Sequence, residues 1–487
     1  MGVRIRPREI KVPDYDPFDN DLLNWTETVE VLTRLVRAIE GPSVLAVDAA
    51  WGNGKSTFIR IWAQYLRNKG FSTVEFNAWE TDYSSDPFVA LSSELTDGLT
   101  RNGIDKSLAE KLDGIKEAGT EVLRRSAPAL IRLATAGLLD VSPFIEQGIG
   151  ELLGTYAETK LAEYGETKEA VREFRCVLQD LAKSISSQSG GQPLVIFIDE
   201  LDRCRPSYAI ELLEIAKHFF AVDHVVFVLA VNRAELAHSI RALYGSEFDA
   251  TGYMRRFIDV DLQLPAPDRQ EFVDAMLTNS MGDDRSHHGM ARLLKGVHTN
   301  ERRLLQAFFS VHNISLRRIS QAIHRLGLAL TLLPNDSRLE FLPMVTSLIL
   351  RTINPEMYYS FFGGDVSDLD VADKVFVSPQ FSALRYSDEG VLFETMLILA
   401  THEGSIGEKR RVNRSDETLS PLMRRYQGWT SKPPEEADSE HASRVLSRVT
   451  EYTHALNATL RGQSIGFKSA MELLELFSEK LVNGQSS

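Results

Sequence analysis

A glycine-rich loop with a lysine and a serine is the clearest chemical feature of the sequence. Residues 49–56 read AAWGNGKS, which matches the phosphate-binding pattern G-x-x-x-x-G-K-[ST] except that Ala49 replaces the first glycine. Such a loop turns successive backbone N–H groups toward phosphates, at the positive end of the following helix. Alanine has the smallest side chain after glycine, so we expect the turn to survive if φ at Ala49 stays negative.

The residue types of this loop have distinct expected roles. Lys55 is expected to reach the β- and γ-phosphates of a nucleoside triphosphate, and the Ser56 hydroxyl to bind Mg²⁺. Gly52 and Gly54 are expected to supply backbone conformations that other residues rarely adopt. The alternative is a glycine-rich turn whose lysine is there by chance. The predicted nucleotide-binding residues are Trp51, Gly52, Asn53, Gly54, Lys55, Ser56 and Thr57.

Two acidic residues end the apolar run PLVIFI at residues 193–198. Asp199 is expected to hold Mg²⁺ at the tip of a strand that neighbours the loop, since this ion prefers oxygen ligands and keeps several waters. Glu200 is expected to polarise the attacking water. Asp202 could orient that water or form an ion pair with Arg203. Without the loop upstream, the same pattern would more often be an acidic turn that caps a helix.

Short apolar segments alternate with helical patterns and predict the scaffold of these residues. Strands that are apolar on both faces and alternate with helices imply a parallel sheet covered on both sides. The predicted fold class is α/β: a three-layer αβα sandwich of the P-loop NTPase type, with a parallel sheet, a helical insertion and a mainly helical C-terminal region. We expect strands at 43–48, 71–76, 193–198, 224–231 and 258–264, and helices at 21–39, 56–66 and 206–220.

The same patterns predict how the chain divides into domains. Residues 1–20 read as an extended N-terminal arm, and residues 21–266 as the P-loop core with the helical insertion at about 95–188. Residues 267–330 are expected to form a small helical lid. Residues 331–487 are expected to form a mainly helical C-terminal domain, in which we find no motif.

Composition limits the classes of function that fit. The net charge of −14 argues against a general nucleic-acid coat, although a local basic groove stays open. Cys176 and Cys204 are the two cysteines, too few for a disulfide framework, and Cys204 is expected to be a small buried apolar residue. The N-terminal segment has no apolar signal-peptide region, and no run reaches the roughly 18 apolar residues of a membrane span. A cytoplasmic protein without an integral membrane span is therefore expected.

Four motifs, in the same order, resemble those of KAP-family P-loop NTPases. Residues 51–56 (WGNGKS) are similar to the family's W-G-S-G-K-S/T loop, and residues 199–204 (DELDRC) to its D-D/E-L-D-R-C element. Residues 76–79 (FNAW) resemble its F-N-P/A-W element, and residues 21–23 (DLL) its opening D-x-L region. The resemblance covers about residues 18–330.

The resemblance implies a member of the STAND class of NTPases, related to the AAA+ group. In that class ATP with Mg²⁺ acts as a switch or assembly signal, which implies a homo-oligomer or a complex with partner proteins. Many relatives carry two membrane spans in the helical insertion, which this sequence lacks. Some bacterial relatives are linked to exclusion of bacteriophage, so the resemblance suggests a role in antiviral defence.

Further residues outside these motifs have expected roles. Asn232 follows the fourth predicted strand, where related NTPases place a residue that senses the γ-phosphate. In a ring-shaped oligomer, Arg255 or Arg256 could contact the nucleotide bound by the neighbouring subunit. The alternative is an exposed basic pair on a helix. Arg317, within SLRRI, resembles the second sensor of the family's N-P-R-x-I/L helix, without the Asn-Pro. Trp79 is expected to pack in the core near the site.

Three functions remain open from the sequence. The first is an ATP-hydrolysing switch, motivated by the set of Lys55, Ser56, Asp199 and Glu200. The second is a scaffold that holds nucleotide without hydrolysing it, motivated by Ala49. The third is a nucleic-acid-associated motor, against which the net charge argues.

Overall fold

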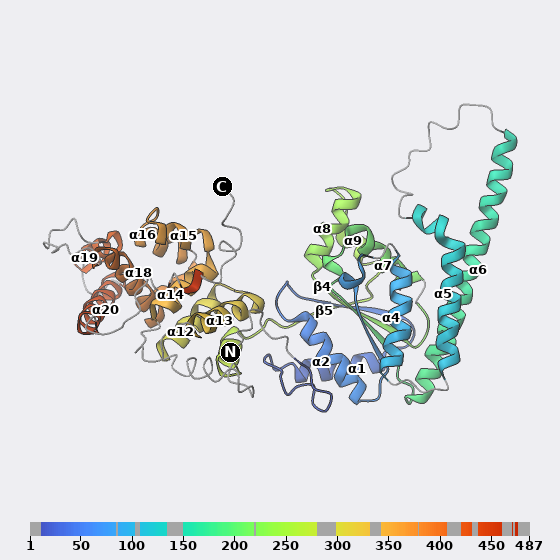
Figure 1. Ribbon diagram of the computed structural model, residues 1–487, viewed down its shortest axis with the longest axis horizontal. Helices are drawn as coiled ribbons and strands as arrows, with labels where there is room; N and C mark the ends of the chain where they lie inside the picture. The colour runs from blue at the N-terminus through green and yellow to red at the C-terminus, as the bar shows by residue number, and fades with distance from the viewer. Residues whose placement is uncertain are drawn as a thin grey trace. The chain divides into compact units, whose positions relative to one another are not determined.

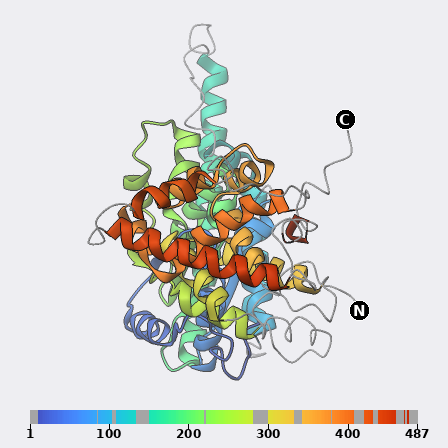
Figure 2. The ribbon, with the colours of Figure 1, turned by 90° about the vertical axis from the view of Figure 1, so that its left-hand side faces the viewer.

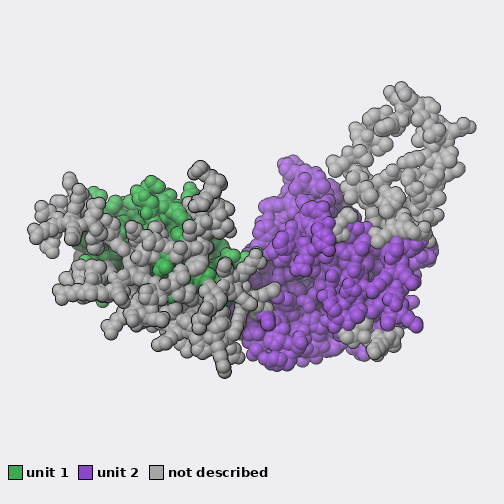
Figure 3. All heavy atoms as spheres, in the orientation of Figure 1, with its two compact units in different colours: residues 1–9, 267–487 green, residues 10–266 purple. Residues whose placement is uncertain are grey.

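The computed structural model shows two compact units, with the boundary between Ala266 and Pro267 (Figures 1 and 3). The first unit along the chain, residues 10–266, is purple and labelled unit 2 in Figure 3, and it holds a β-sheet with helices. The second unit, which includes residues 267–487, is green and labelled unit 1. The structure describes residues 11–83, 86–102, 108–133, 150–218, 221–279, 299–331, 342–377, 379–406, 420–430, 437–459, 470 and 473–475.

The sheet of the first unit has five parallel strands in the order β2-β3-β4-β1-β5. The predicted parallel sheet is confirmed. The expectation that the strand of Asp199 neighbours the strand before the loop is wrong, because β4 lies between β1 and β3. The strands are β1 (Ser43–Asp48), β2 (Thr73–Asn77), β3 (Leu194–Asp199), β4 (Val225–Val231) and β5 (Val260–Gln263).

Alternating apolar side chains attach a helical layer to each face of the sheet. In β3, Ile196 and Ile198 point into one core and Phe197 into the other. Helices α1 (Thr26–Ala38) and α2 (Lys55–Asn68) cover the Phe197 face, and α4 (Pro87–Arg101), α7 (Pro206–His218) and α8 (Arg233–Tyr244) cover the opposite face (Figure 1). The predicted three-layer sandwich is confirmed.

The segment between β2 and β3 is the predicted helical insertion. Helices α5 (Ala109–Leu133) and α6 (Gly150–Gln188) pack along each other, and α5 packs against α4 (Figure 1). The remaining short helices of this unit are α3 (Ala78–Thr81), η3 (Leu201–Arg203) and α9 (Ala250–Met254).

The described part of the second unit is helical, as predicted. Helices α13 and α14 pack together across the boundary at residue 330 that we expected between lid and C-terminal domain, and α20 packs along α18 and α19 (Figure 2). That division of the second unit stays a prediction. The helices are α10 (Arg269–Asn279), α12 (Thr299–Val311), α13 (Leu316–Thr331), α14 (Leu342–Ile353), α15 (Pro355–Gly363), α16 (Asp368–Val375), α17 (Pro379–Tyr386), α18 (Asp388–Ile406), α19 (Pro421–Thr430) and α20 (Ala437–Thr459).

Helix α1 begins five residues later than the predicted range of 21–39. The carboxylate of Asp21 accepts hydrogen bonds from the N–H groups of Leu23, at 3.0 Å, and Trp25, at 2.5 Å. Asn24 has a φ of 53°, outside the helical region. The side chain of Asp21 thus competes with the helix for these donors and delays its start.

Within the described part of the chain, no helix carries an apolar stretch of the length that a bilayer crossing requires.

Candidate nucleotide-binding site

The glycine-rich loop joins β1 to α2 at the carboxyl edge of the sheet. Gly52 and Gly54 have φ values of 78° and 91°, so both adopt the left-handed conformation that favours glycine. Ala49 is buried, its N–H donates to the carbonyl oxygen of Val231 at 3.2 Å, and its φ is not positive. The loop therefore keeps its turn with alanine at its first position, as we expected.

Trp25 supports the loop from the α1 side, a role that our sequence analysis missed. A Cβ atom added to Gly54 would lie 2.7 Å from Cη2 of Trp25. The ring of Trp25 packs edge-on against Phe58, with 5.2 Å between centroids. Trp25 is in turn held by the hydrogen bonds of Asp21. The available signal was an aromatic residue two positions after the D-x-L segment.

Lys55 opens α2 and lies inside the loop. Its Nζ donates to the carbonyl oxygen of Ala49 at 2.6 Å and lies 4.0 Å from Oδ2 of Asp202. Burial lowers the pKa of this ammonium group below its ordinary value, and the negative charge of Asp202 opposes that shift. A phosphate in the loop would bring further negative charge to a buried cation.

Ser56, in the first turn of α2, lies beside Asp199 at the end of β3, although β4 separates β3 from the strand before the loop. Helix α2 packs across both β3 and β4, so its first turn reaches the end of β3. Burial raises the pKa of the Asp199 carboxyl above its ordinary value, and hydrogen bonds from the Ser56 hydroxyl and the Glu200 N–H, the latter at 2.8 Å, oppose this shift. A hydroxyl and a carboxylate oxygen are a donor pair that fits Mg²⁺.

Asp202 is buried beneath the loop and connects it to the turn after β3. It accepts a hydrogen bond from the indole Nε1–H of Trp51, whose side chain is 43% exposed. The expected alternative of an Asp202–Arg203 ion pair is wrong: Nη1 of Arg203 lies 2.7 Å from Oε1 of Glu200. Asp202 thus serves as an anchor for Trp51 and as a neighbouring charge for Lys55.

Glu200, the expected base, follows Asp199 in an uncommon backbone conformation. Its φ and ψ are 60° and 22°, in the left-handed region that a residue with a Cβ rarely occupies. The guanidinium of its partner Arg203 lies 5.8 Å from the centroid of the Trp79 ring. Trp79 is 54% exposed, so the expectation that it packs in the core is wrong, although it does lie near the site.

Asn232 follows β4, between the strands that carry the loop and Asp199. Its Oδ1 accepts a hydrogen bond from the N–H of Ala234 at 3.2 Å and caps α8. The next N–H, of Arg233, donates to Oδ1 of Asp48 at 3.1 Å. The strand order therefore brings Asn232 to the same edge as the loop, and its role as a sensor stays a prediction.

The three arginines that we expected to contact phosphate are far from the loop along the chain. Arg255 and Arg256 are exposed at the end of α9, with Arg256 5.8 Å from the centroid of the Tyr253 ring. Arg317 is exposed on α13, in the second unit. The expected contacts of all three with phosphate stay predictions.

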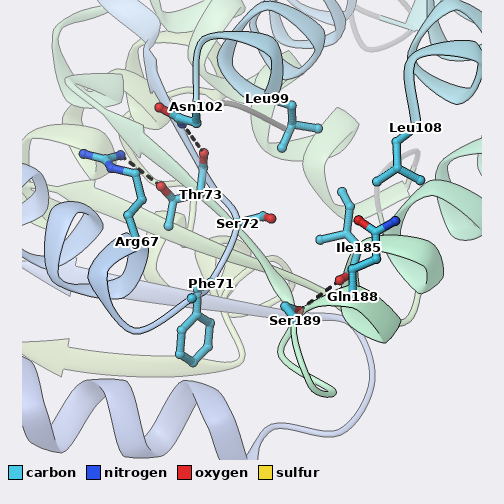
Figure 4. A pocket seen from close by; sticks show the side chains of 11 residues that line it. Arg67, Phe71, Ser72, Thr73, Leu99, Asn102, Leu108, Ile185, Gln188 and Ser189 are labelled. Carbon is cyan, nitrogen blue, oxygen red and sulfur yellow. Dashed lines mark hydrogen bonds between the residues drawn. The ribbon is translucent and has the colours of Figure 1, made fainter. Parts of the chain in front are cut away.

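A separate cavity of about 260 Å³ lies at the opposite edge of the sheet (Figure 4). It is bounded by Arg67 at the end of α2 and by Ser72 and Thr73 at the start of β2. Nη1 of Arg67 donates hydrogen bonds to Oγ1 of Thr73, at 2.9 Å, and to Oε1 of Glu75, at 2.8 Å. Because this cavity lies at the amino-terminal ends of the strands, it is not the phosphate site.

The fold and the loop together define a P-loop NTPase domain. The model of the KAP family P-loop domain matches residues 27–333, more than half of the chain. The chain therefore belongs to the KAP family of P-loop NTPases. No curated protein matches this sequence. The family accounts for nucleotide binding in general terms.

Proposed function

We propose that this protein binds ATP with Mg²⁺ at residues 51–57 and hydrolyses it, as a switch that controls assembly with partner proteins or with further copies of the chain. The observation that carries the proposal is the arrangement of the loop against the turn after β3: Nζ of Lys55 lies 4.0 Å from Oδ2 of Asp202, and the Ser56 hydroxyl lies beside the Asp199 carboxyl. It links the loop to the acidic strand end across β4, and it pairs two oxygens of the kind that Mg²⁺ prefers.

In this proposal each side chain acts at a stated atom. Lys55 Nζ would leave the loop carbonyl that it now contacts and bind phosphate oxygens, offsetting the charge that develops on them. Ser56 and Asp199 would hold Mg²⁺, which supplies further positive charge to the same oxygens. Glu200 would accept a proton as a water oxygen bonds to the γ-phosphorus and the bond to the β–γ bridging oxygen breaks. Asn232 would donate a hydrogen bond to the γ-phosphate.

Two variants and one control test the hydrolytic site. Lys55→Ala should weaken Mg-ATP binding by about tenfold or more, because the charged contact with the phosphates is lost. Glu200→Gln should bind ATP with an unchanged Kd while kcat falls by about 10²–10⁴-fold, the usual contribution of a general base. The matched control is Lys69→Ala, an exposed lysine at the other end of α2. Binding would be measured by calorimetry and turnover by phosphate release.

The outcomes separate the proposed switch from the scaffold. Phosphate release that is unchanged in Lys55→Ala would exclude hydrolysis at this loop. ATP that stays intact on the wild-type protein would instead support a nucleotide-bound scaffold. If the switch is correct, Glu200→Gln loaded with ATP should elute from size exclusion with a larger mass than the nucleotide-free protein, and the wild type should return to the smaller mass after hydrolysis.

We also propose that the protein works in the bacterial cytoplasm in defence against bacteriophage, a role that rests on the family resemblance alone. Bacteria that produce the wild-type chain should then give fewer plaques than bacteria that produce Lys55→Ala at the same level. Equal plaque numbers across a panel of phages would remove this proposal and leave the hydrolytic site unaffected.

A further inference from the structure

The turn after β3 contains an ion pair that the proposed reaction does not use. Nη1 of Arg203 lies 2.7 Å from Oε1 of Glu200, and the two side chains are only 25% and 14% exposed. We propose that Arg203 is a positioning residue, which fixes the carboxylate of Glu200 for hydrolysis, and that Trp79 holds Arg203 in turn. This inference rests on the proposed function, because it concerns the same base.

Arg203 holds the main chain of Glu200 as well as its side chain. The N–H of Arg203 donates to the carbonyl oxygen of Glu200 at 3.1 Å and closes the short helix η3. Glu200 sits at the start of this turn with a φ of 60°, a conformation that costs free energy and persists only where the surroundings enforce it. The backbone hydrogen bond at position 203 therefore closes the turn, and the Arg203 side chain directs the carboxylate of Glu200.

The pairing of β2 with β3 explains why Trp79 reaches Arg203. Asn77 is paired with Asp199 at the ends of these strands, so the residues that follow each of them emerge side by side. The side-chain oxygen of Asn77 accepts the N–H of Trp79 at 3.1 Å and starts α3. The Trp79 ring then faces the guanidinium of Arg203 at 5.8 Å, within the range of a cation–π contact.

The contact with Arg203 gives a structural role to the exposed side chain of Trp79. More than half of the Trp79 surface faces solvent, so the burial of this side chain contributes little to the core. An aromatic face restricts the guanidinium of Arg203 to one side of the turn. A restrained guanidinium fixes the carboxylate of Glu200 more narrowly than a free arginine side chain would.

The test compares Mg-ATP turnover in variants of this turn. Arg203→Gln should lower kcat by about tenfold or more with unchanged KM and unchanged nucleotide Kd, because the residue acts through Glu200 and not through the nucleotide. Arg203→Lys should restore most of kcat, since a lysine keeps the positive charge that holds the carboxylate of Glu200. Trp79→Ala should give a smaller loss of kcat, and Trp79→Phe should behave as the wild type.

Arg205 provides the matched control. It also connects this turn to the α3 region, because its guanidinium Nε lies 3.0 Å from Oδ1 of Asp82. Arg205→Gln should leave kcat near that of the wild type. An equal loss of kcat in Arg205→Gln, or an unchanged or increased kcat in Arg203→Gln, would overturn the positioning role.

A second measurement does not depend on turnover. In the nucleotide-free protein, melting temperatures of Glu200→Gln, Arg203→Gln and the double variant form a cycle. If the pair is formed, the two single losses together should exceed the loss in the double variant, and additive losses would overturn the inference. A wild type without turnover but with a non-additive cycle would refute the proposed hydrolysis and leave the pairing intact.

Discussion

At the scale of single residues, burial shifts the pKa values of two ionisable groups in the candidate site before any nucleotide binds. Burial lowers the pKa of Lys55 and raises that of Asp199, so in both cases the ionised form is disfavoured. A phosphate beside Lys55 and a Mg²⁺ ion beside Asp199 would each reverse the shift. Binding energy can therefore come from groups whose desolvation was already completed when the chain folded.

The conformation of Gly54 gives a prediction at this scale. Gly54→Ala should reduce both stability and nucleotide affinity, because φ is 91° and the new Cβ would lie 2.7 Å from the Trp25 ring. The backbone strain alone is about 1–2 kcal/mol. Gly190→Ala is the control, since Gly190 has a φ of 72° but no atom within 4 Å of an added Cβ.

Thermal unfolding and calorimetry with Mg-ATP would measure the two effects. We expect Gly54→Ala to lower the melting temperature by more than Gly190→Ala and to be the only one of the two that weakens ATP binding. Equal effects of both substitutions on stability would mean that the contact with Trp25 adds nothing to the strain.

At the scale of elements, the site depends on helices and strands that approach from both sides of β4. Helix α2 carries Ser56 over β4 to the end of β3, and the pairing of β2 with β3 brings Trp79 beside the turn of Arg203. Neither the crossing of α2 over β4 nor the pairing of β2 with β3 follows from the order of the elements along the chain. On the opposite face, α7 packs against α4 and α8 to complete the covering of the sheet.

Helix α7 carries a glutamate whose ionisation should oppose folding. Partial burial, and then the charges of Asp86 and Glu214, raise the pKa of Glu211 to about 7 from 4.5. The folded state therefore binds more protons than the unfolded state between these values, and stability falls as pH rises through that window. Glu211→Gln should remove the loss and stabilise the protein near pH 8 by about 1 kcal/mol after allowance for solvent screening.

Melting temperatures measured across this window would check the sign. Glu211→Gln should raise the melting temperature by about 2–4 °C near pH 8, with a much smaller effect near pH 4. Glu110→Gln, at an exposed position in the first turn of α5, is the control and should show no such pH dependence. A stabilisation of the same size at both pH values would contradict a role for ionisation.

At the scale of the whole molecule, the nucleotide site and its supporting core belong to one compact unit. The loop, Asp199, Glu200 and Asn232 all precede residue 267, where the second unit begins. Arg317 belongs to the second unit, and the family match extends to residue 333, across this boundary. Nucleotide binding and any contribution of Arg317 can therefore be separated by truncation.

A fragment of residues 11–266 should fold alone and bind Mg-ATP with a Kd within about threefold of that of the full chain, because the loss of remote contacts costs little binding free energy. Its turnover should match that of Arg317→Ala in the full chain if this arginine acts on the γ-phosphate. Circular dichroism, calorimetry and phosphate release would measure these properties. A folded fragment that does not bind ATP would show that the second unit completes the site.

Much of the site could be predicted because its chemistry is local in the sequence. The loop from Trp51 to Ser56 joins a strand to a helix, and its two glycines adopt the expected left-handed conformation. Short apolar runs likewise located the strands to within about two residues, because a strand that is buried on both faces of a sheet carries apolar side chains at almost every position. The predicted fold class and the expected acidic strand end follow from these local patterns.

Only the tertiary structure decided how these parts meet. The order of strands in a parallel sheet is set by crossovers over long stretches of chain, so the sequence did not indicate that β4 lies between the loop and Asp199. Arg203 forms its ion pair with Glu200 and not with Asp202, and this choice depends on the backbone conformation of the turn. The support of Gly54 by Trp25 and the exposure of Trp79 are likewise contacts or surfaces created when distant segments pack.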